Sequence, residues 1–189
     1  MTDNAASSPT ETGTAKDVAD LVESVGDQLI EALRGDRDPC LIGIQRRGDV
    51  IANRLQTRLQ DALDLDIPLG SLDITIYRDD FDSLTEAPVV GKTDITFTVD
   101  DRTVVLVDDV LYTGRTIRAA LEEILEFGRP TRILLVTMVD RGWRELPIQP
   151  DIVGTRLETD REDNVQILVE EVVGEDAIRV TRSGSQGSK

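Results

Sequence analysis

The stretch VVLVDDVLYTGRT, residues 104–116, is apolar at its start, acidic at its centre and rich in hydroxyl groups and glycine at its end. The apolar run has the length and composition of a buried strand, and the pattern TIRAALEEILEF that follows is typical of an amphipathic helix. Asp108 and Asp109 are therefore expected where a strand leads into a turn and a helix. In an open parallel sheet, ligands bind at this edge.

The turn from Tyr112 to Thr116 has the composition of a phosphate-binding loop. Its backbone N–H groups and the positive end of the following helix form a cradle for an anion, and Thr113 and Thr116 add hydroxyl donors. Two carboxylates beside such a cradle disfavour phosphate alone, but they suit a ligand that also carries sugar hydroxyls and a magnesium ion. A phosphorylated ribose meets all three demands. The residues also fit a simpler alternative, in which the acids cap the helix and the turn binds nothing.

Apolar periodicity along the rest of the chain predicts an α/β domain. Strands are expected at 40–44, 72–77, 103–108, 132–139, 165–172 and 177–182, and helices at 18–33, 48–63 and 116–127. Near-continuous apolar strands separated by a crossover helix are typical of a mainly parallel central sheet flanked by helices. The polar stretch from Arg78 to Thr93 is predicted to be a long loop.

Length and composition predict one folded domain. The 189 residues, 39% of them hydrophobic, are enough for one full core. Residues 1–15 and 183–189 are small, polar and without periodicity, so we expect them to be flexible tails around a domain that spans residues 16–182.

Charge and missing residue types exclude several functions. The formal net charge is −16, so nucleic acid and anionic lipid should be repelled unless cations gather on one face. Histidine is absent and Cys40 is the single cysteine, which excludes Ser-His-Asp and Cys-His catalysis and a disulfide within the chain. Neither a signal segment nor a membrane-spanning apolar run is present, so we expect a cytoplasmic protein that does not contact membranes.

Residues 104–116 resemble the phosphoribosyl-pyrophosphate (PRPP) motif of type I phosphoribosyltransferases. GIQRRG (43–48), SLDITIYRDD (71–80) and VDRGWRELPI (139–148) further resemble the bifunctional pyrimidine-operon attenuation regulators that are also uracil phosphoribosyltransferases. The resemblance runs from about residue 16 to 182 and implies the type I phosphoribosyltransferase fold, with a small hood and a flexible loop. It implies an enzyme that converts uracil and PRPP to UMP and pyrophosphate with Mg²⁺.

The resemblance assigns PRPP and Mg²⁺ to the central motif and to GIQRRG. Asp108 and Asp109 are implied to contact the ribose hydroxyls and to hold Mg²⁺ through water, without a direct metal bond, and Arg47 completes the catalytic candidates. The family usually has threonine at the position of Arg46, so Arg47 is preferred as the pyrophosphate contact. The PRPP-binding candidates are Arg46, Arg47, Asp108, Asp109, Val110, Leu111, Tyr112, Thr113, Gly114, Arg115 and Thr116.

The resemblance also assigns a base site and a closing loop. Arg141 resembles the family's basic residue near the uracil carbonyl, and Val165 matches a position that meets the base through its backbone. The reaction needs no covalent enzyme intermediate, in keeping with the missing histidine. The general base for uracil N1 is left open, with Asp109 as one candidate. The flexible-loop candidates are Tyr77, Arg78, Asp79 and Asp80.

Two other functions stay open at this point. One is an RNA-binding attenuator that senses UMP or UTP and has weak catalysis, and the other is a phosphoribosyltransferase for another base. The expected first helix is acidic where RNA-binding relatives are basic, and Trp143 stands where histidine is usual. Trp143 suits a platform for a stacked RNA base or an anchor in a homodimer or higher homo-oligomer. Leader RNA of pyrimidine operons would need a local basic patch, for which the candidates are Arg54, Arg58, Arg144, Arg156 and Arg161.

Overall fold

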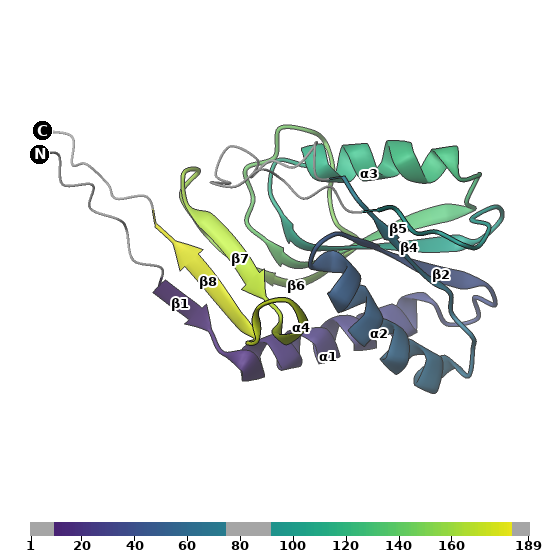
Figure 1. Ribbon diagram of the computed structural model, residues 1–189, viewed down its shortest axis with the longest axis horizontal. Coiled ribbons are helices and arrows are strands. Elements are labelled where there is room, and N and C mark those ends of the chain that lie inside the picture. Colours follow the sequence, from purple (N-terminus) through teal and green to yellow (C-terminus); the bar gives the residue numbers. More distant parts are fainter. Residues whose placement is uncertain (1–9, 75–91, 183–189) are drawn as a thin grey trace, which may run out of the picture.

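The computed structural model describes residues 10–74 and 92–182, and its main body is a five-stranded parallel sheet (Figure 1). The strand order is β3-β2-β4-β5-β6, so the strand that carries the paired acids lies in the middle. Every neighbouring pair in this sheet is parallel. The strands are β2 (Pro39–Ile44), β3 (Leu69–Leu72), β4 (Thr103–Leu111), β5 (Arg132–Asp140) and β6 (Ile152–Arg156).

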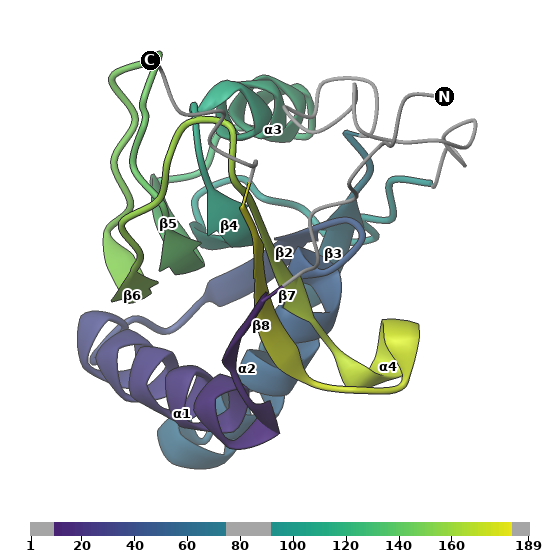
Figure 2. The same cartoon turned by 90° about the vertical axis from the view of Figure 1, so that its left-hand side faces the viewer.

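Three long helices cover the two faces of the main sheet. Helices α1 (Ala15–Ala32) and α2 (Gly48–Leu63) lie on one face, and α3 (Arg115–Glu126) lies on the other, as Figures 1 and 2 show. A parallel sheet covered on both faces buries both sides of its strands, which explains their near-continuous apolar sequences. The sequence-based expectation of a parallel sheet flanked by helices is confirmed.

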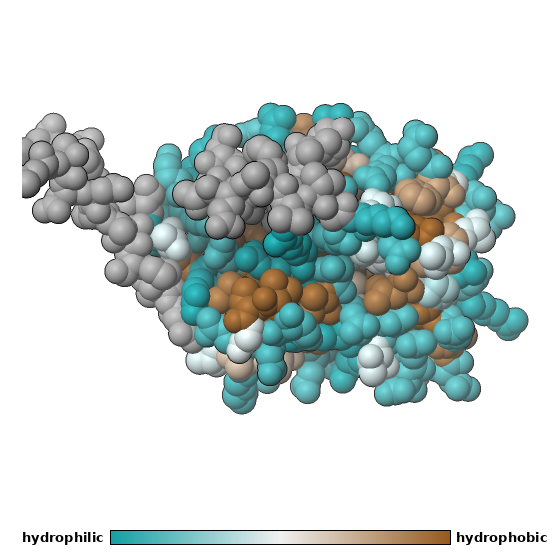
Figure 3. Space-filling model, viewed as in Figure 1, coloured by the Kyte–Doolittle hydropathy of each residue, from teal (hydrophilic) through white to brown (hydrophobic). Residues whose placement is uncertain are grey.

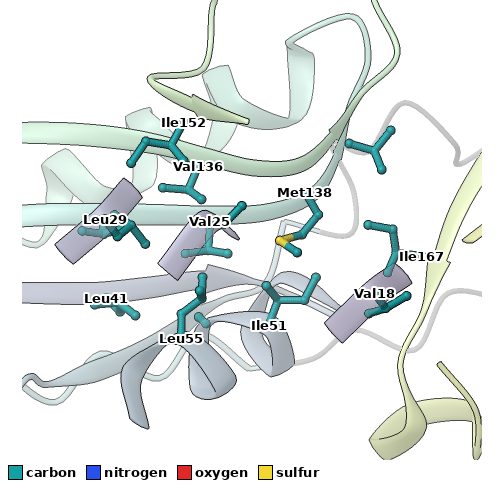
Figure 4. Packing of buried hydrophobic residues seen from close by; sticks show 14 of the residues in the cluster. Val18, Val25, Leu29, Leu41, Ile51, Leu55, Val136, Met138, Ile152 and Ile167 are labelled. Carbon is teal, nitrogen blue, oxygen red and sulfur yellow. The ribbon is translucent and has the colours of Figure 1, made fainter. Parts of the chain in front are cut away.

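The apolar stripe of α1 packs against both α2 and the main sheet. Figure 4 shows Val25 and Leu29 of α1 in one buried cluster with Leu55 of α2 and Val136 of β5. All four side chains are inaccessible to solvent. Burial of one such side chain stabilises a fold by about 1.5–3 kcal/mol. The helical spacing seen in the sequence therefore reflects one continuous core.

A second, antiparallel sheet of three strands lies beside the main sheet and forms the expected hood (Figure 2). Strand β8 (Ala177–Thr181) lies between β1 (Thr10–Gly13) and β7 (Asn164–Leu168). A single turn of helix, α4 (Glu170–Val173), connects β7 to β8. Strand β7 is thus an edge strand, and it contacts β4 of the main sheet.

The structure corrects several boundaries predicted from periodicity. Thr10–Gly13, expected in the N-terminal tail, is a strand, because backbone pairing with β8 needs no apolar pattern. Of the strand expected at 72–77, Leu72 is the last residue of β3 (Leu69–Leu72), which pairs in parallel with β2, and residues 73–74 are not in a strand, whereas residues 75–77 lie outside the described residues. The strand expected at 165–172 ends at Leu168 and gives way to α4, and β6 was not predicted.

Residues 1–9, 75–91 and 183–189 lie outside the described residues. Most of the predicted loop falls in this part of the chain, and so do the flexible-loop candidates Tyr77, Arg78, Asp79 and Asp80. These assignments stay predictions.

The face of the molecule in Figure 3 is mainly hydrophilic. One hydrophobic group on this face lies over α4, where Val172 and Val173 are exposed. Within residues 10–74 and 92–182, no helix has both the length and the apolar character needed to cross a membrane.

Candidate active site

Asp108 and Asp109 are both buried near the carboxyl end of β4, each with only 2% of its surface exposed. The strand continues beyond them to Leu111, which is paired with Asp140 of β5. The Oδ1 atom of Asp108 accepts a hydrogen bond of 3.0 Å from the amide of Asp109. Burying a carboxylate is costly unless a cation or hydrogen bonds compensate. The site therefore needs a cation or further hydrogen-bond donors close by.

Arg47 supplies positive charge to Asp109. Its Nη1 atom lies 3.5 Å from Oδ2 of Asp109. Arg47 is half-buried at the start of α2, directly after the loop that follows β2. Its neighbour Arg46 is exposed, and the peptide bond between Gln45 and Arg46 is cis. Both arginines of GIQRRG thus follow β2, and Arg47 lies beside the acid pair.

Glycine brings the arginine loop against β4. A Cβ atom on Gly48 would lie 2.5 Å from the carbonyl oxygen of Val107, and one on Gly43 would lie 2.3 Å from the Cα of Asp49. Both distances are far below van der Waals contact, so larger residues would push the loop away from the acids.

The turn after β4 presents the start of α3 at the same edge. Gly114 has φ +94°, a left-handed conformation that favours glycine, and α3 begins at the next residue. The Oγ1 atom of Thr113 accepts a hydrogen bond of 3.2 Å from the amide of Arg115. The first amides of a helix lack intrahelical acceptors, so the turn can donate to an anion. Thr116 is half-buried, whereas Arg115 is exposed and pairs with Glu145 at 2.8 Å.

Three other candidates, Val110, Leu111 and Tyr112, also make contacts that stabilise the fold. The side chain of Leu111 is buried in the core beneath α3, and Val110 packs against the core on the opposite face. The carbonyl of Tyr112 accepts a hydrogen bond of 2.7 Å from Nη1 of Arg144. Arg144 also donates to Oδ1 of Asp140 at 2.7 Å. Sequence reasoning missed this structural role of Arg144, because nothing in the local pattern RGWRE distinguishes a half-buried arginine from an exposed one.

Arg141 lies directly after β5 and is 6% exposed. Its guanidinium carbon lies 4.2 Å from the centroid of the Tyr112 ring, a cation–π contact. Its Nη2 atom donates to the carbonyls of Asp160 at 2.8 Å and Arg161 at 3.3 Å. Burial lowers the pKa of Arg141, but an arginine starts so far above neutrality that it stays charged. The amide of Arg141 donates to the carbonyl of Leu111 at 3.1 Å, which joins this corner to β4.

Val165 lies on β7, opposite Val180 of β8, and is largely buried. Because β7 is the edge strand of the hood, the side of its backbone that faces away from β8 has no strand partner among the described residues. That side can offer N–H and C=O groups to a ligand. The contact between β7 and β4 brings the hood to the same end of the molecule as the acids.

Asp49 is a further acid close enough to Asp109 to be influenced by its charge, and sequence reasoning did not single it out. It lies in the first turn of α2, and burial, with the negative charge of Asp109 as a smaller cause, raises its pKa. Asp49 lines a cavity of about 380 Å³ together with Ser71 and Asp94. An acid in the first turn of a helix is common, so its sequence position alone carries no functional signal.

Comparison with known proteins identifies related chains. The family model described as "Phosphoribosyl transferase domain" matches residues 13–173. The "Bifunctional protein PyrR" of Roseiflexus sp. (strain RS-1) is 48% identical over 160 residues, which cover 85% of this chain and 87% of the relative. The protein of the same name from Clostridioides difficile (strain 630) is 42% identical over 165 residues, covering 87% and 93%.

Solved structures are similar in fold. The hypoxanthine phosphoribosyltransferase of Trypanosoma cruzi superposes with a TM-score of 0.68 at 16% identity, covering 93% of this chain and 97% of that one. The purine phosphoribosyltransferase from Pyrococcus horikoshii Ot3 has a TM-score of 0.58 at 29% identity, covering 76% and 85%.

Proposed function

Because the chain belongs to the phosphoribosyl transferase family, and within it to the bifunctional PyrR proteins, we propose that it transfers the phosphoribosyl group of PRPP to uracil, with UMP and pyrophosphate as products. The observation that carries this proposal is the buried acid pair of β4, which lies beside Arg47 and directly before the turn that opens α3. This edge combines groups for sugar hydroxyls, pyrophosphate and a 5′-phosphate.

Each part of PRPP has a complementary partner in the proposed complex. The amides and hydroxyls from Thr113 to Thr116 bind the 5′-phosphate, with Gly114 allowing the turn. Asp108 and Asp109 accept hydrogen bonds from the ribose hydroxyls. Arg47, with the exposed Arg46 beside it, binds the pyrophosphate.

Mg²⁺ fits this arrangement as a companion of PRPP. The ion prefers oxygen ligands and keeps several water molecules, and the acid pair offers carboxylate oxygens. The described segments, 10–74 and 92–182, contain no group of three or more acidic, cysteine or histidine side chains arranged to hold a metal. We therefore assign most of its ligands to PRPP and water, with Asp108 and Asp109 nearby. When bound, Mg²⁺ neutralises charge on the departing pyrophosphate.

The chain's own residues stabilise the charges that develop in the reaction. As the bond between the ribose carbon and pyrophosphate breaks, the sugar becomes positive and the leaving group negative. Asp108 and Asp109 stabilise the positive sugar, and Arg47 stabilises the pyrophosphate. Charges held in a buried site act strongly because water does not screen them. No side-chain nucleophile is required.

Uracil is placed in this proposal between Arg141 and the hood. The buried guanidinium of Arg141 donates to a carbonyl of the base, and the edge of β7 at Val165 offers backbone groups to its other side. Donors and acceptors in fixed positions distinguish bases strongly, because a wrong base leaves buried polar groups unpaired.

An assay of the purified protein with PRPP and Mg²⁺ tests both the reaction and the base. We expect UMP and pyrophosphate from uracil, and much slower turnover of cytosine and hypoxanthine supplied at equal concentration. Preferred use of another base would leave the phosphoribosyl transfer standing and overturn uracil as its acceptor. Absence of turnover with every base would overturn the enzymatic proposal.

The relatives are named bifunctional, which favours a second activity. The second candidate function is RNA-dependent regulation of pyrimidine genes. The structure supports it poorly. The outward face of α1 is acidic, with Asp20, Glu23 and Glu31 exposed. All five candidate arginines are paired with acids: Arg54, Arg58, Arg144, Arg156 and Arg161.

Filter binding to pyrimidine leader RNA, with and without UMP and across a salt series, tests this second candidate. Because the arginines are already neutralised, we expect weak binding that falls steeply as salt rises. Tight, UMP-enhanced and sequence-selective binding near physiological salt would place regulation ahead of catalysis.

A further inference from the structure

Tyr112 belongs to the motif that resembles a PRPP site, but its side chain contacts Arg141 and the carbonyl of Arg161. We call Tyr112, Arg141 and the carbonyls of residues 159–161 the base corner. The ring of Tyr112 lies 4.2 Å from the guanidinium carbon of Arg141. Its hydroxyl donates to the carbonyl of Arg161 at 2.9 Å. Both contacts join the end of β4 to residues far away in the sequence.

Arg141 needs such support to act on a small planar ligand. A free arginine side chain has many rotamers, and fixing one of them costs entropy. In the base corner the guanidinium is held by the Tyr112 ring and by the carbonyl of Asp160 at 2.8 Å. Its Nε atom is buried and has no hydrogen-bond partner among the described residues. The ring therefore sets the orientation of a group whose donors are only partly used within the fold.

Tyr112 also fixes the acceptor that Arg141 uses. The phenol hydroxyl and Nη2 of Arg141 donate to the same carbonyl, that of Arg161, at 2.9 and 3.3 Å. Trp143 holds the same segment two residues earlier, because its Nε1 atom donates to the carbonyl of Thr159 at 2.8 Å. Trp143 thus anchors the segment, whereas Tyr112 anchors both the segment and the guanidinium.

We propose that Tyr112 is a positioning residue for uracil binding, which holds the guanidinium of Arg141 in the orientation that meets the base. This inference rests on the proposed function. Tyr112 directly precedes Thr113 and Gly114 of the phosphate turn, so one short segment binds the 5′-phosphate through its backbone and orients the base-recognising arginine through a side chain. PRPP and uracil are thereby aligned by the same element.

Two substitutions separate the contributions of the ring and the hydroxyl. Tyr112→Leu removes both, and we expect the KM for uracil to rise about tenfold while the KM for PRPP changes less than about twofold. Tyr112→Phe keeps the ring, and we expect the KM for uracil to rise about two- to threefold. Because phenylalanine preserves the volume of the ring, the phenylalanine variant tests the proposal even if the leucine variant fails to fold.

Trp143→Phe is the matched control, because it also removes one hydrogen bond to the 159–161 segment, and within the described residues the Trp143 side chain makes no hydrogen bond to Arg141. We expect its KM for uracil to stay within about twofold of the wild type. An equal rise in Trp143→Phe and Tyr112→Phe would show that the segment matters and not the arginine. An equal rise of both KM values in the Tyr112 variants would show that the turn itself is damaged. Either result overturns the inference.

The same measurements distinguish this inference from the proposed function. If the wild type forms UMP and both Tyr112 variants keep its KM for uracil, the positioning role is wrong and the enzymatic function stands. If the wild type forms no UMP from uracil, both fall. Calorimetric titration with UMP adds a readout independent of turnover, and weaker UMP binding in Tyr112→Leu is expected.

Discussion

The phosphate turn, Thr113 to Thr116 with the acid pair before it, and the base corner are neighbours in the molecule but are built in opposite ways. The phosphate turn is nearly continuous in sequence, and in the proposed complex its backbone amides at the start of α3 bind the phosphate. The base corner joins the end of β4, the end of β5 and the segment before β7. The first depends on local conformation, and the second depends on how distant segments pack.

The two regions also differ in what carries their specificity. In the phosphate turn, the choice of residue is limited at Gly114, because only a residue that tolerates positive φ fits there. In the base corner, the acceptors are carbonyls, which every residue possesses, so the donors Tyr112 and Arg141 decide the arrangement. Changes in one region should therefore alter PRPP use, and changes in the other should alter uracil use.

The largest expected effect comes from the acid pair. Converting both Asp108 and Asp109 to asparagine keeps their shape and removes their charge, and turnover should fall by about 10²–10³-fold because transition-state electrostatics are lost. Glu122→Gln, which removes a charge from the exposed side of α3, serves as a control and should keep wild-type turnover. Steady-state UMP formation measures both. A double variant with near-wild-type turnover would contradict the catalytic assignment.

Two glycine substitutions separate an effect on ligand binding from the effect of backbone strain. Gly114→Val and Gly35→Val both place a side chain at positive φ, +94° and +84°, so each should lose about 1–2 kcal/mol of stability or more. A Cβ on Gly35 would have no heavy-atom neighbour within 4 Å, and Gly35 lies beyond the end of α1. We expect calorimetry to detect no PRPP binding by Gly114→Val and unchanged binding by Gly35→Val. Wild-type PRPP affinity in Gly114→Val would refute the placement of the phosphate.

The smallest expected effect concerns the attachment of the hood. Arg54 of α2 donates to Glu171 at 2.9 Å and to Asp176 at 2.8 Å, and these hydrogen bonds lower the pKa of both acids from their ordinary values of 4.5 and 3.8. A carboxylate with a lowered folded pKa stabilises the fold above its ordinary pKa and loses this contribution as pH falls through the folded value.

Arg54→Met should therefore cost about 1 kcal/mol at pH 7, a modest figure because Glu171 is partly exposed. The difference from wild type should shrink on acidification toward pH 3. Urea unfolding at both pH values measures it. A constant difference would assign the effect to packing of the arginine stem and not to charge. The KM for uracil should change little, since Arg54 does not contact the base corner.

Periodicity predicted most of the fold, because burial on both faces leaves a strong apolar signal in β2, β4 and β5. Periodicity failed where backbone hydrogen bonding between strands, and not burial, decides the structure. Thr10–Gly13 joins the hood through backbone hydrogen bonds, and Leu69–Leu72 is placed by its register with β2. The acid pair and the α3 turn were predicted at the edge of the sheet where the strand ends, and the family resemblance added Arg47 to them.

The sequence by itself determined the phosphate turn, because its two acids, its glycine and the following helix are consecutive and their chemistry follows from local backbone geometry. Only the tertiary structure decided the base corner. The carbonyls of residues 159–161 have no sequence signature, and the partners of Tyr112 lie 29 and 49 residues away at Arg141 and Arg161. The packing of β4 against β5 and of the hood against β4 brings these groups within contact distance, and no local pattern records that packing.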